Sequence, residues 1–190
     1  MPNKLVIISG PSGSGKTTIV NALIGESPGL FGKVVTATTR DMRDGEVYGV
    51  DYTFYRRDMF GQMIREGKFL EHAEVHGNLY GTPLSAVNQA LMTHSFSLLP
   101  IDVQGHAAIR KSNHPSLPKD CIVSFMISVN IDMLRDRLEA RGTKTGEIDR
   151  RLSVAQAELD RSGEFDYVVW NYQSQLAETI ATIREFLRVR

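Results

Sequence analysis

The sequence predicts an α/β fold in which helices cover a central parallel sheet. First, Leu5–Ile8 is a continuous and partly β-branched apolar run, as expected for a strand buried on both faces. Second, strand-like and helix-like segments alternate along most of the chain, which is typical of parallel sheets. Third, residues 39–82 and 131–162 depart from this alternation. We therefore expect one core with two excursions.

Apolar segments bounded by turn residues predict the strands of the core. They lie at residues 5–8, 34–37, 97–103, 121–129 and 165–170. Apolar residues at helical spacing predict the helices. These lie at residues 17–24, 83–92, 105–111 and 175–189, and at 131–162 with a break at 142–146.

Residues 39–82 are too long and too patterned for a loop. Residues 51–55 and 69–73 alternate or cluster like short strands, and residues 58–66 read as a helix. This part of the chain therefore predicts an inserted α+β lobe.

Composition excludes several classes of protein. The chain has 190 residues, of which 42% are apolar and 23% charged, as in a single globular domain. Its 22 basic residues balance 22 acidic ones, which argues against a general nucleic-acid binder. Cys121 is the only cysteine, so an internal disulfide and a cysteine-based zinc site are impossible. No segment approaches the ~20 apolar residues of a membrane span, so we expect a soluble, cytoplasmic protein that binds neither membranes nor nucleic acid.

The segment from Gly10 to Thr17 fits the Walker A pattern Gly-x-x-x-x-Gly-Lys-Thr, and it lies between a predicted strand and a predicted helix. Its glycines allow backbone N–H groups to turn toward an anion, and the helix N-terminus adds partial positive charge. Lys16 can reach the β- and γ-phosphates of a nucleotide, and the Thr17 hydroxyl can ligate Mg²⁺. The alternative is a glycine-rich turn without a ligand. The predicted nucleotide-binding residues of this loop are Ser12, Gly13, Ser14, Gly15, Lys16, Thr17 and Thr18.

Asp102 lies at the end of a predicted apolar strand. A Walker B carboxylate occupies such a place beside Mg²⁺. An aspartate that caps the following turn would occupy it equally well. The spacing leaves both interpretations open, and Thr17 and Asp102 are the candidate metal ligands.

The inserted lobe contains a second group of candidate site residues. Arg40 and Arg43 follow a predicted strand and could hold a phosphate dianion with forked hydrogen bonds. Glu71 could accept hydrogen bonds from a purine edge, and Tyr80 could bind phosphate or stack on a base. Taken singly, each also fits a surface or packing role.

Taken together, the motifs resemble those of guanylate kinases over nearly the whole chain. The matching segments are Gly10–Thr17, Thr36–Glu46, Gly49–Phe54, Phe69–Ala73, Gly77–Thr82, Ile101–Gly105, Arg137–Thr143, Arg151–Leu152 and Phe165–Asn171. The resemblance implies a P-loop NTPase three-layer fold with an inserted GMP-binding lobe and a helical lid. The implied parts are a core (residues 1–35, 83–131 and 163–190), a GMP-binding lobe (36–82) and a lid (132–162).

The resemblance also implies residue roles. Thr36, Glu71 and Thr82 would contact guanine, and Arg40, Arg43, Tyr52, Tyr80 and Gly81 complete the GMP-binding set. Lys16, Arg137, Arg141 and Arg151 would act on the transferring phosphate, and Asn171 would lie near the adenine of ATP. The implied reaction is ATP + GMP → ADP + GDP with Mg²⁺, with dGMP as a further acceptor, in a monomer or homodimer. Arg135, Arg150 and Arg161 are assigned to a solvated helix face.

The chain departs from the family pattern at several positions. Pro100 stands where an acidic residue normally helps to read the guanine amino group, and a proline also removes a backbone donor from a strand. Met42 replaces a usual proline, residues 128–130 lack a usual proline turn, and the lid loop is one residue short. Two other functions stay open: a catalytically inactive module of this fold that binds proteins, and a kinase of another phosphorylated acceptor.

Overall fold

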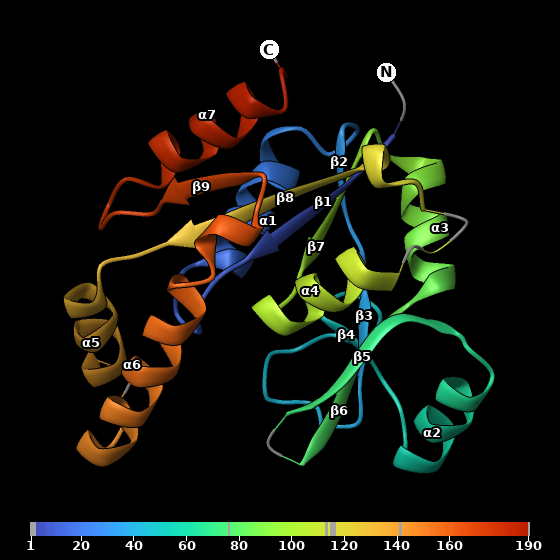
Figure 1. The fold of residues 1–190 in the computed structure, drawn as a ribbon, viewed down its shortest axis with the longest axis horizontal. Helices are drawn as coiled ribbons and strands as arrows, with labels where there is room; N and C mark the ends of the chain where they lie inside the picture. The colour runs from blue at the N-terminus through green and yellow to red at the C-terminus, as the bar shows by residue number, and fades with distance from the viewer. Residues whose placement is uncertain (1–2, 76, 113, 115–116, 141, 190) are drawn as a thin grey trace.

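The computed structural model describes residues 3–75, 77–112, 114, 117–140 and 142–189. A five-stranded sheet crosses the middle of the molecule (Figure 1). In spatial order its strands are β2 (Phe31–Lys33), β7 (Phe96–Pro100), β1 (Lys4–Ser9), β8 (Ile122–Ser128) and β9 (Tyr167–Trp170). All neighbouring pairs are parallel, which confirms the predicted fold class.

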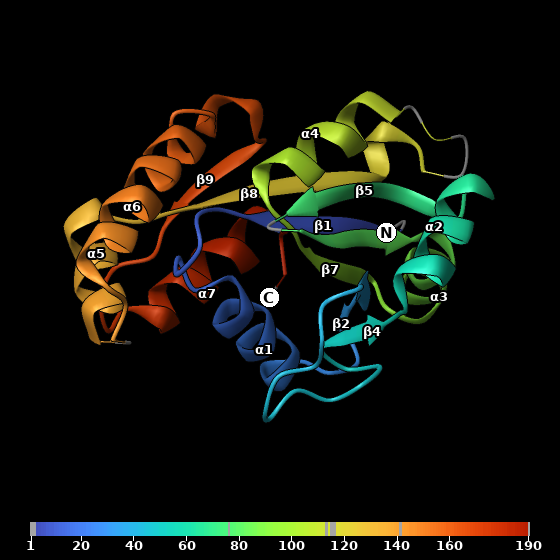
Figure 2. The same ribbon diagram turned by 90° about the horizontal axis from the view of Figure 1, so that it is seen from below.

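Helices cover both faces of this sheet. They are α1 (Lys16–Glu26), α3 (Leu84–Thr93), α4 (Val103–Ser112) and α7 (Leu176–Phe186). Successive side chains of a strand face opposite sides, so Val6 and Ile8 of β1 pack with α1 and α7. Leu5 and Ile7 pack with α3 and α4. Figure 2 shows α4 on one side of the sheet and α1 with α7 on the other.

A second, four-stranded sheet lies beyond one end of the central sheet (Figure 1). Its strands, in spatial order, are β4 (Tyr52–Phe54), β3 (Thr36–Thr38), β6 (Asn78–Pro83) and β5 (Phe69–Val75). Helix α2 (Arg57–Arg65) packs on this sheet, where the rings of Phe60 and Phe69 stack with centroids 4.4 Å apart. We call residues 36–83 the side lobe; it is the α+β unit that residues 39–82 predict.

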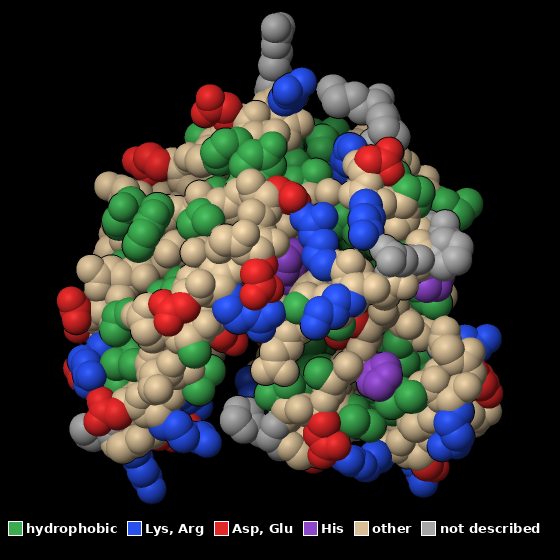
Figure 3. Space-filling model, in the orientation of Figure 1, with side chains coloured by type: hydrophobic (Ala, Val, Ile, Leu, Met, Phe, Trp, Pro, Cys, Tyr) green, Lys and Arg blue, Asp and Glu red, His purple; other side chains and the backbone are tan. Residues whose placement is uncertain are grey.

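The second excursion consists of two helices, α5 (Ile131–Ala140) and α6 (Thr145–Leu159), which we call the helical arm. They share a small core that includes Leu134, Leu138, Ile148 and Leu152. Short 3₁₀ turns, η1 (Lys119–Cys121) and η2 (Ser162–Glu164), complete the chain. Figure 3 shows that the surface is hollowed between the arm and the side lobe.

The predicted strand at residues 34–37 is wrong in its bounds, because the chain passes between the two sheets there. Strand β2 of the central sheet ends at Lys33, and β3 of the side lobe begins at Thr36. Val34 still donates its N–H to Leu98 O at 2.8 Å, so it belongs to the core. A continuous β-branched run does not reveal a change of partner sheet.

Two other boundaries also differ from the prediction. The strand expected at 97–103 ends at Pro100, and Val103 begins α4 instead, where it is buried against Met126 and Phe165. Pro83 closes β6 rather than opening α3. Strand β6 was not predicted, because Gly81 and Pro83 weaken its strand pattern.

Within the described residues, no helix has the length and apolar content that a membrane crossing requires.

Candidate active site

The loop between β1 and α1 contains three glycines with positive φ, Gly10, Gly13 and Gly15. Gly10 and Gly15 have φ values of +145° and +96°, which residues with a Cβ rarely adopt. A Cβ on Gly10 would lie 2.5 Å from Ile127 O of β8, and one on Gly15 would lie 2.5 Å from the Asn171 amide nitrogen. The loop therefore requires glycine both for its turn and for its close packing against Ile127 of β8 and against Asn171, which directly follows β9.

Lys16 folds back over this loop. Its Nζ donates to Gly10 O at 2.6 Å and to Pro11 O at 3.0 Å. Burial lowers the pKa of the Lys16 ammonium, and the carboxylates of Glu158 and Asp102 partly offset this effect. The ammonium thus lies beside the loop that is predicted to hold the phosphates, with the hydroxyl-bearing Thr17 exposed next to it.

Asn171 is hydrogen-bonded to the phosphate loop. Its buried side chain donates Nδ2–H to Ser14 O at 2.8 Å and accepts from the Thr179 hydroxyl at 3.3 Å. It also lines a cavity of about 400 Å³ together with Gly13, Gly15, Thr18, Arg137, Ala140, Tyr172, Ser174 and Leu176. The predicted contact of Asn171 with adenine remains a prediction.

The arginines of the helical arm differ in what they reach. Arg137 donates to Gly13 O at 2.8 Å, so it already touches the phosphate loop. Arg151 is turned instead toward Glu147 of its own helix, at 2.5 Å, and its side chain is 42% exposed. Arg141 lies outside the described residues. Arg135 pairs with Asp149 at an exposed position, which agrees with the assignment to a solvated face.

A cavity of about 210 Å³ lies between the core and the side lobe. Its walls combine predicted residues of both parts, which are Lys16, Asp102, Thr36, Tyr52, Glu71, Tyr80 and Gly81. Apolar residues complete the lining: Ala73, Val75, Pro100 and Ile101. The tertiary structure therefore brings the loop lysine and most of the predicted acceptor residues to one cavity.

Glu71 lies in this cavity with its carboxylate largely removed from water. Its Oε1 accepts a hydrogen bond from the Thr82 hydroxyl at 2.5 Å. Burial raises the pKa of Glu71 from 4.5 to about 7; the Asp102 carboxylate adds to the rise, and the Thr82 hydrogen bonds oppose it. A carboxylate in this state gains stability from hydrogen-bond donors that a ligand brings.

Of the two roles that the sequence left open for Asp102, the structure shows the capping role, and the role as a metal ligand stays a prediction. The Oδ1 atom of Asp102 accepts from Gly105 N at 2.7 Å and so caps α4, while the side chain also lines the cavity near Lys16. Within the described residues no three His, Cys, Asp or Glu side chains form a metal cluster. One carboxylate and the Thr17 hydroxyl nevertheless fit Mg²⁺, which usually takes one or two carboxylates together with nucleotide phosphates and water.

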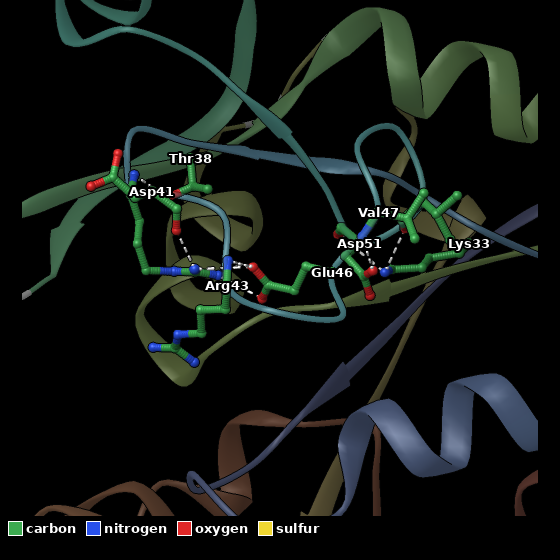
Figure 4. A network of polar contacts seen from close by, with 9 residues as sticks. Lys33, Thr38, Asp41, Arg43, Glu46, Val47 and Asp51 are labelled. Atoms are coloured by element: carbon green, nitrogen blue, oxygen red, sulfur yellow. Dashed lines mark hydrogen bonds and ion pairs between the residues drawn. The ribbon is translucent and has the colours of Figure 1, made fainter.

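The two lobe arginines are held by an acidic residue that was not assigned to the site. Arg40 forms a bidentate pair with Glu46, at 2.8 and 3.0 Å, and lies over the rings of Tyr52 and Phe54. Glu46 also accepts from the Arg43 main-chain N–H at 2.8 Å. Figure 4 shows the Arg43 guanidinium directed away from Glu46. The sequence contained a signal for this role of Glu46, because an acidic residue six positions after Arg40 in the same loop can pair with the arginine.

Pro100 is the last residue of β7 and pairs with Ile8 of β1. Phe96 N donates to Leu30 O, and Val34 N donates to Leu98 O. The main-chain N–H and C=O groups of the even-numbered residues of β7 therefore point toward β2. Strand β2 ends at Lys33, before it would reach the level of Pro100. Pro100 therefore offers no N–H toward the β2 side at the end of β7, and its ring also forms part of the cavity wall.

The parallel sheet, the phosphate loop and the lysine that covers it define a P-loop nucleotide-binding protein. The family model described as guanylate kinase matches residues 2–190. The chain is 38% identical over 187 residues to "Guanylate kinase" of Rubrobacter xylanophilus, covering 97% of this chain and 95% of that protein. This chain belongs to the guanylate kinase family of enzymes.

Two further relatives agree with this assignment. "Guanylate kinase 1" of rice is 44% identical over 172 residues, which are 88% of this chain; the chain spans only 44% of the length of that protein. The crystal structure of guanylate kinase from Anaplasma phagocytophilum matches with a TM-score of 0.75 and 29% identity, covering 98% of this chain and 85% of that one.

Proposed function

We propose that this enzyme transfers the γ-phosphoryl group of ATP to GMP, with dGMP as a second acceptor. The observation that carries the proposal is the cavity between core and side lobe. Lys16 of the phosphate loop and Glu71 of the side lobe both line it. A nucleotide on the loop and a nucleoside monophosphate on the lobe would therefore place their phosphates next to each other.

The donor is bound by the loop of Ser12–Thr18. Backbone N–H groups and the N-terminus of α1 favour phosphate charge there. The cavity that Asn171 and Thr18 line would take the nucleoside. Arg137 reaches Gly13 O from the arm, and Arg141 and Arg151 would follow when the arm closes as a lid over the donor.

The acceptor is bound by the side lobe. Guanine presents adjacent N–H donors, which suit the buried carboxylate of Glu71, and Thr36 and Thr82 lie in the same wall or next to it. Arg40 and Arg43 would hold the phosphate, and the hydroxyls of Tyr52 and Tyr80 would add hydrogen bonds. None of these assignments involves the 2′-hydroxyl of the ribose, which supports dGMP as an acceptor.

The chemistry is a direct in-line displacement. An oxygen of the GMP phosphate attacks the γ-phosphorus while the bond to the β–γ bridging oxygen breaks, and ADP leaves. The attacking phosphate is largely dianionic at neutral pH, because its second pKa is near 6, so no general base is required. Lys16 and the arm arginines neutralise charge on the transferring group, and binding both phosphates in one cavity aligns them. Bound Mg²⁺, held through Thr17 and Asp102, would supply further charge neutralisation.

A coupled assay of ADP release with GMP, dGMP, AMP, UMP and CMP tests the proposal. We expect turnover with GMP and dGMP to exceed that with the other three. Lys16→Ala is expected to abolish turnover and to keep GMP binding, whereas Lys4→Ala, at the opposite end of β1, serves as the matched control. Faster turnover with another monophosphate would indicate a different acceptor, and no turnover with any would indicate an inactive module.

A further inference from the structure

The polypeptide passes from the core to the side lobe within very few residues. Lys33 pairs with Leu98 in the central sheet, and Thr36 pairs with Tyr52 in the side lobe. Val34 is still hydrogen-bonded to the core, as described above. Any rotation of the side lobe relative to the core therefore involves the segment directly after Lys33.

The side chain of Lys33 spans this connection. Its Nζ donates to Val50 O at 2.8 Å and to Asp51 O at 3.1 Å. Figure 4 shows the Lys33 side chain reaching toward Asp51 of the neighbouring loop. Burial lowers the pKa of Lys33, and the carboxylates of Asp51 and Glu46 oppose this effect. A core strand is thus tied to a loop of the side lobe by an ammonium group with two carbonyl acceptors.

The loop that Lys33 contacts is a tight turn closed by hydrogen bonds to one carbonyl, that of Val47. The N–H groups of Val50 and Asp51 both donate to Val47 O, at 3.1 and 2.9 Å. At the start of the turn, Asp51 Oδ2 accepts from Val47 N at 2.8 Å. The carbonyls that follow in such a turn need hydrogen-bond donors from outside it, and a lysine ammonium carries three. The ammonium of Lys33 fills this role for the turn of residues 47–51.

Both ends of this turn lead to residues of the proposed acceptor site. Glu46 directly precedes the turn and holds the side chain of Arg40 and the main chain of Arg43. Tyr52 directly follows the turn and lines the cavity between core and side lobe. A shift of the turn would therefore displace both arginines and the tyrosine together.

We propose that Lys33 is a positioning residue for the acceptor phosphate, because it ties the turn of residues 47–51 to the core strand β2. The proposal rests on the proposed function, in which Arg40 and Arg43 bind the phosphate of GMP. Lys33 itself touches no phosphate in this arrangement. It acts through Glu46 and Tyr52, which flank the turn that it holds.

The test compares Lys33→Met with Lys4→Met in the full chain. Lys4 also donates its ammonium to a main-chain carbonyl, that of Asp120, but at the opposite end of β1 from the phosphate loop. In Lys33→Met we expect amide hydrogen exchange in residues 47–51 to accelerate about tenfold. We expect the KM for GMP to rise about tenfold, with the KM for ATP and kcat changed less than about twofold. Lys4→Met should change none of these quantities.

Lys33→Arg provides the rescue, since a guanidinium can donate to both carbonyls, and it should restore the KM for GMP to within about threefold of the wild-type value. Unchanged exchange in Lys33→Met overturns the link between core and turn. Faster exchange with an unchanged KM for GMP overturns the positioning role. Arg43→Ala distinguishes a failure of the positioning role from a failure of the proposed function. If Arg43→Ala also leaves the KM for GMP unchanged, the arginines do not bind the acceptor phosphate. The positioning role then fails with that assignment.

Discussion

Replacing Glu71 by glutamine is expected to stabilise the free enzyme at alkaline pH while it weakens GMP binding. The variant keeps the shape of the side chain and an oxygen that can accept from the Thr82 hydroxyl. It removes an ionised carboxylate from a buried cavity, where the neighbouring Asp102 carboxylate disfavours a second negative charge. The same change removes the acceptor that the N–H groups of guanine require.

The magnitude follows from the pKa of Glu71, which is about 7 in the folded protein against an ordinary value of 4.5. Between these values the folded state binds more protons than the unfolded state, so wild-type stability falls as pH rises through this window. At about 1.4 kcal/mol for each pH unit, the full penalty above pH 7 is about 3 kcal/mol. Glu71→Gln avoids this penalty at about pH 8, and its advantage shrinks to under about 1 kcal/mol near pH 5.

Chemical denaturation of both proteins at the two pH values measures this difference. Glu74→Gln is the matched control, because Glu74 lies on the same strand but is exposed and paired with Arg57. The KM for GMP of Glu71→Gln is expected to rise roughly 10- to 100-fold, as for the loss of hydrogen bonds to a charged group. Equal stability of variant and wild type at about pH 8, or a difference that does not change with pH, would refute the reasoning.

Two further predictions concern the donor loop and the cavity wall. Asn171→Ala leaves the buried Ser14 carbonyl without its partner, so we expect a loss of about 1–3 kcal/mol in stability and a raised KM for ATP. Thr179→Val removes the hydroxyl that contacts the Asn171 amide oxygen but keeps the bond to Ser14, so its effect should be smaller, and the reverse order would contradict this account. Pro100→Asp places a carboxylate beside Glu71, so denaturation should show a less stable free enzyme, while the coupled assay should show a lower KM for GMP or sharper discrimination against other bases. An unchanged preference among bases would mean that Pro100 does not face the base.

The sequence alone was sufficient for the fold class and the donor loop, because both depend on local patterns. The apolar run of β1 marks a strand buried on both faces. The Gly-x-x-x-x-Gly-Lys-Thr pattern defines a loop conformation through residues that are close in the chain. The alternation of strands and helices then leaves few arrangements other than a parallel sheet.

Only the tertiary structure revealed the contacts between distant segments. The Asn171 side chain supports Ser14 across 157 residues of sequence. The chain leaves β2 and enters β3 within a few residues, and the sequence there does not show which sheet each residue joins. The pairing partners decide this: Leu98 for Lys33 in the central sheet, and Tyr52 for Thr36 in the side lobe.

The opening feature of the prediction, a parallel α/β core with two excursions, was determined by the sequence because hydrophobic periodicity and glycine placement are local properties. What Glu71, Pro100 and Lys33 contribute was decided by tertiary structure. Burial raises the pKa of Glu71, the fold places Pro100 in the wall of the cavity that Glu71 also lines, and a loop of the side lobe supplies the carbonyls that Lys33 binds. Burial and long-range partners come from packing, which no local pattern in a single sequence specifies.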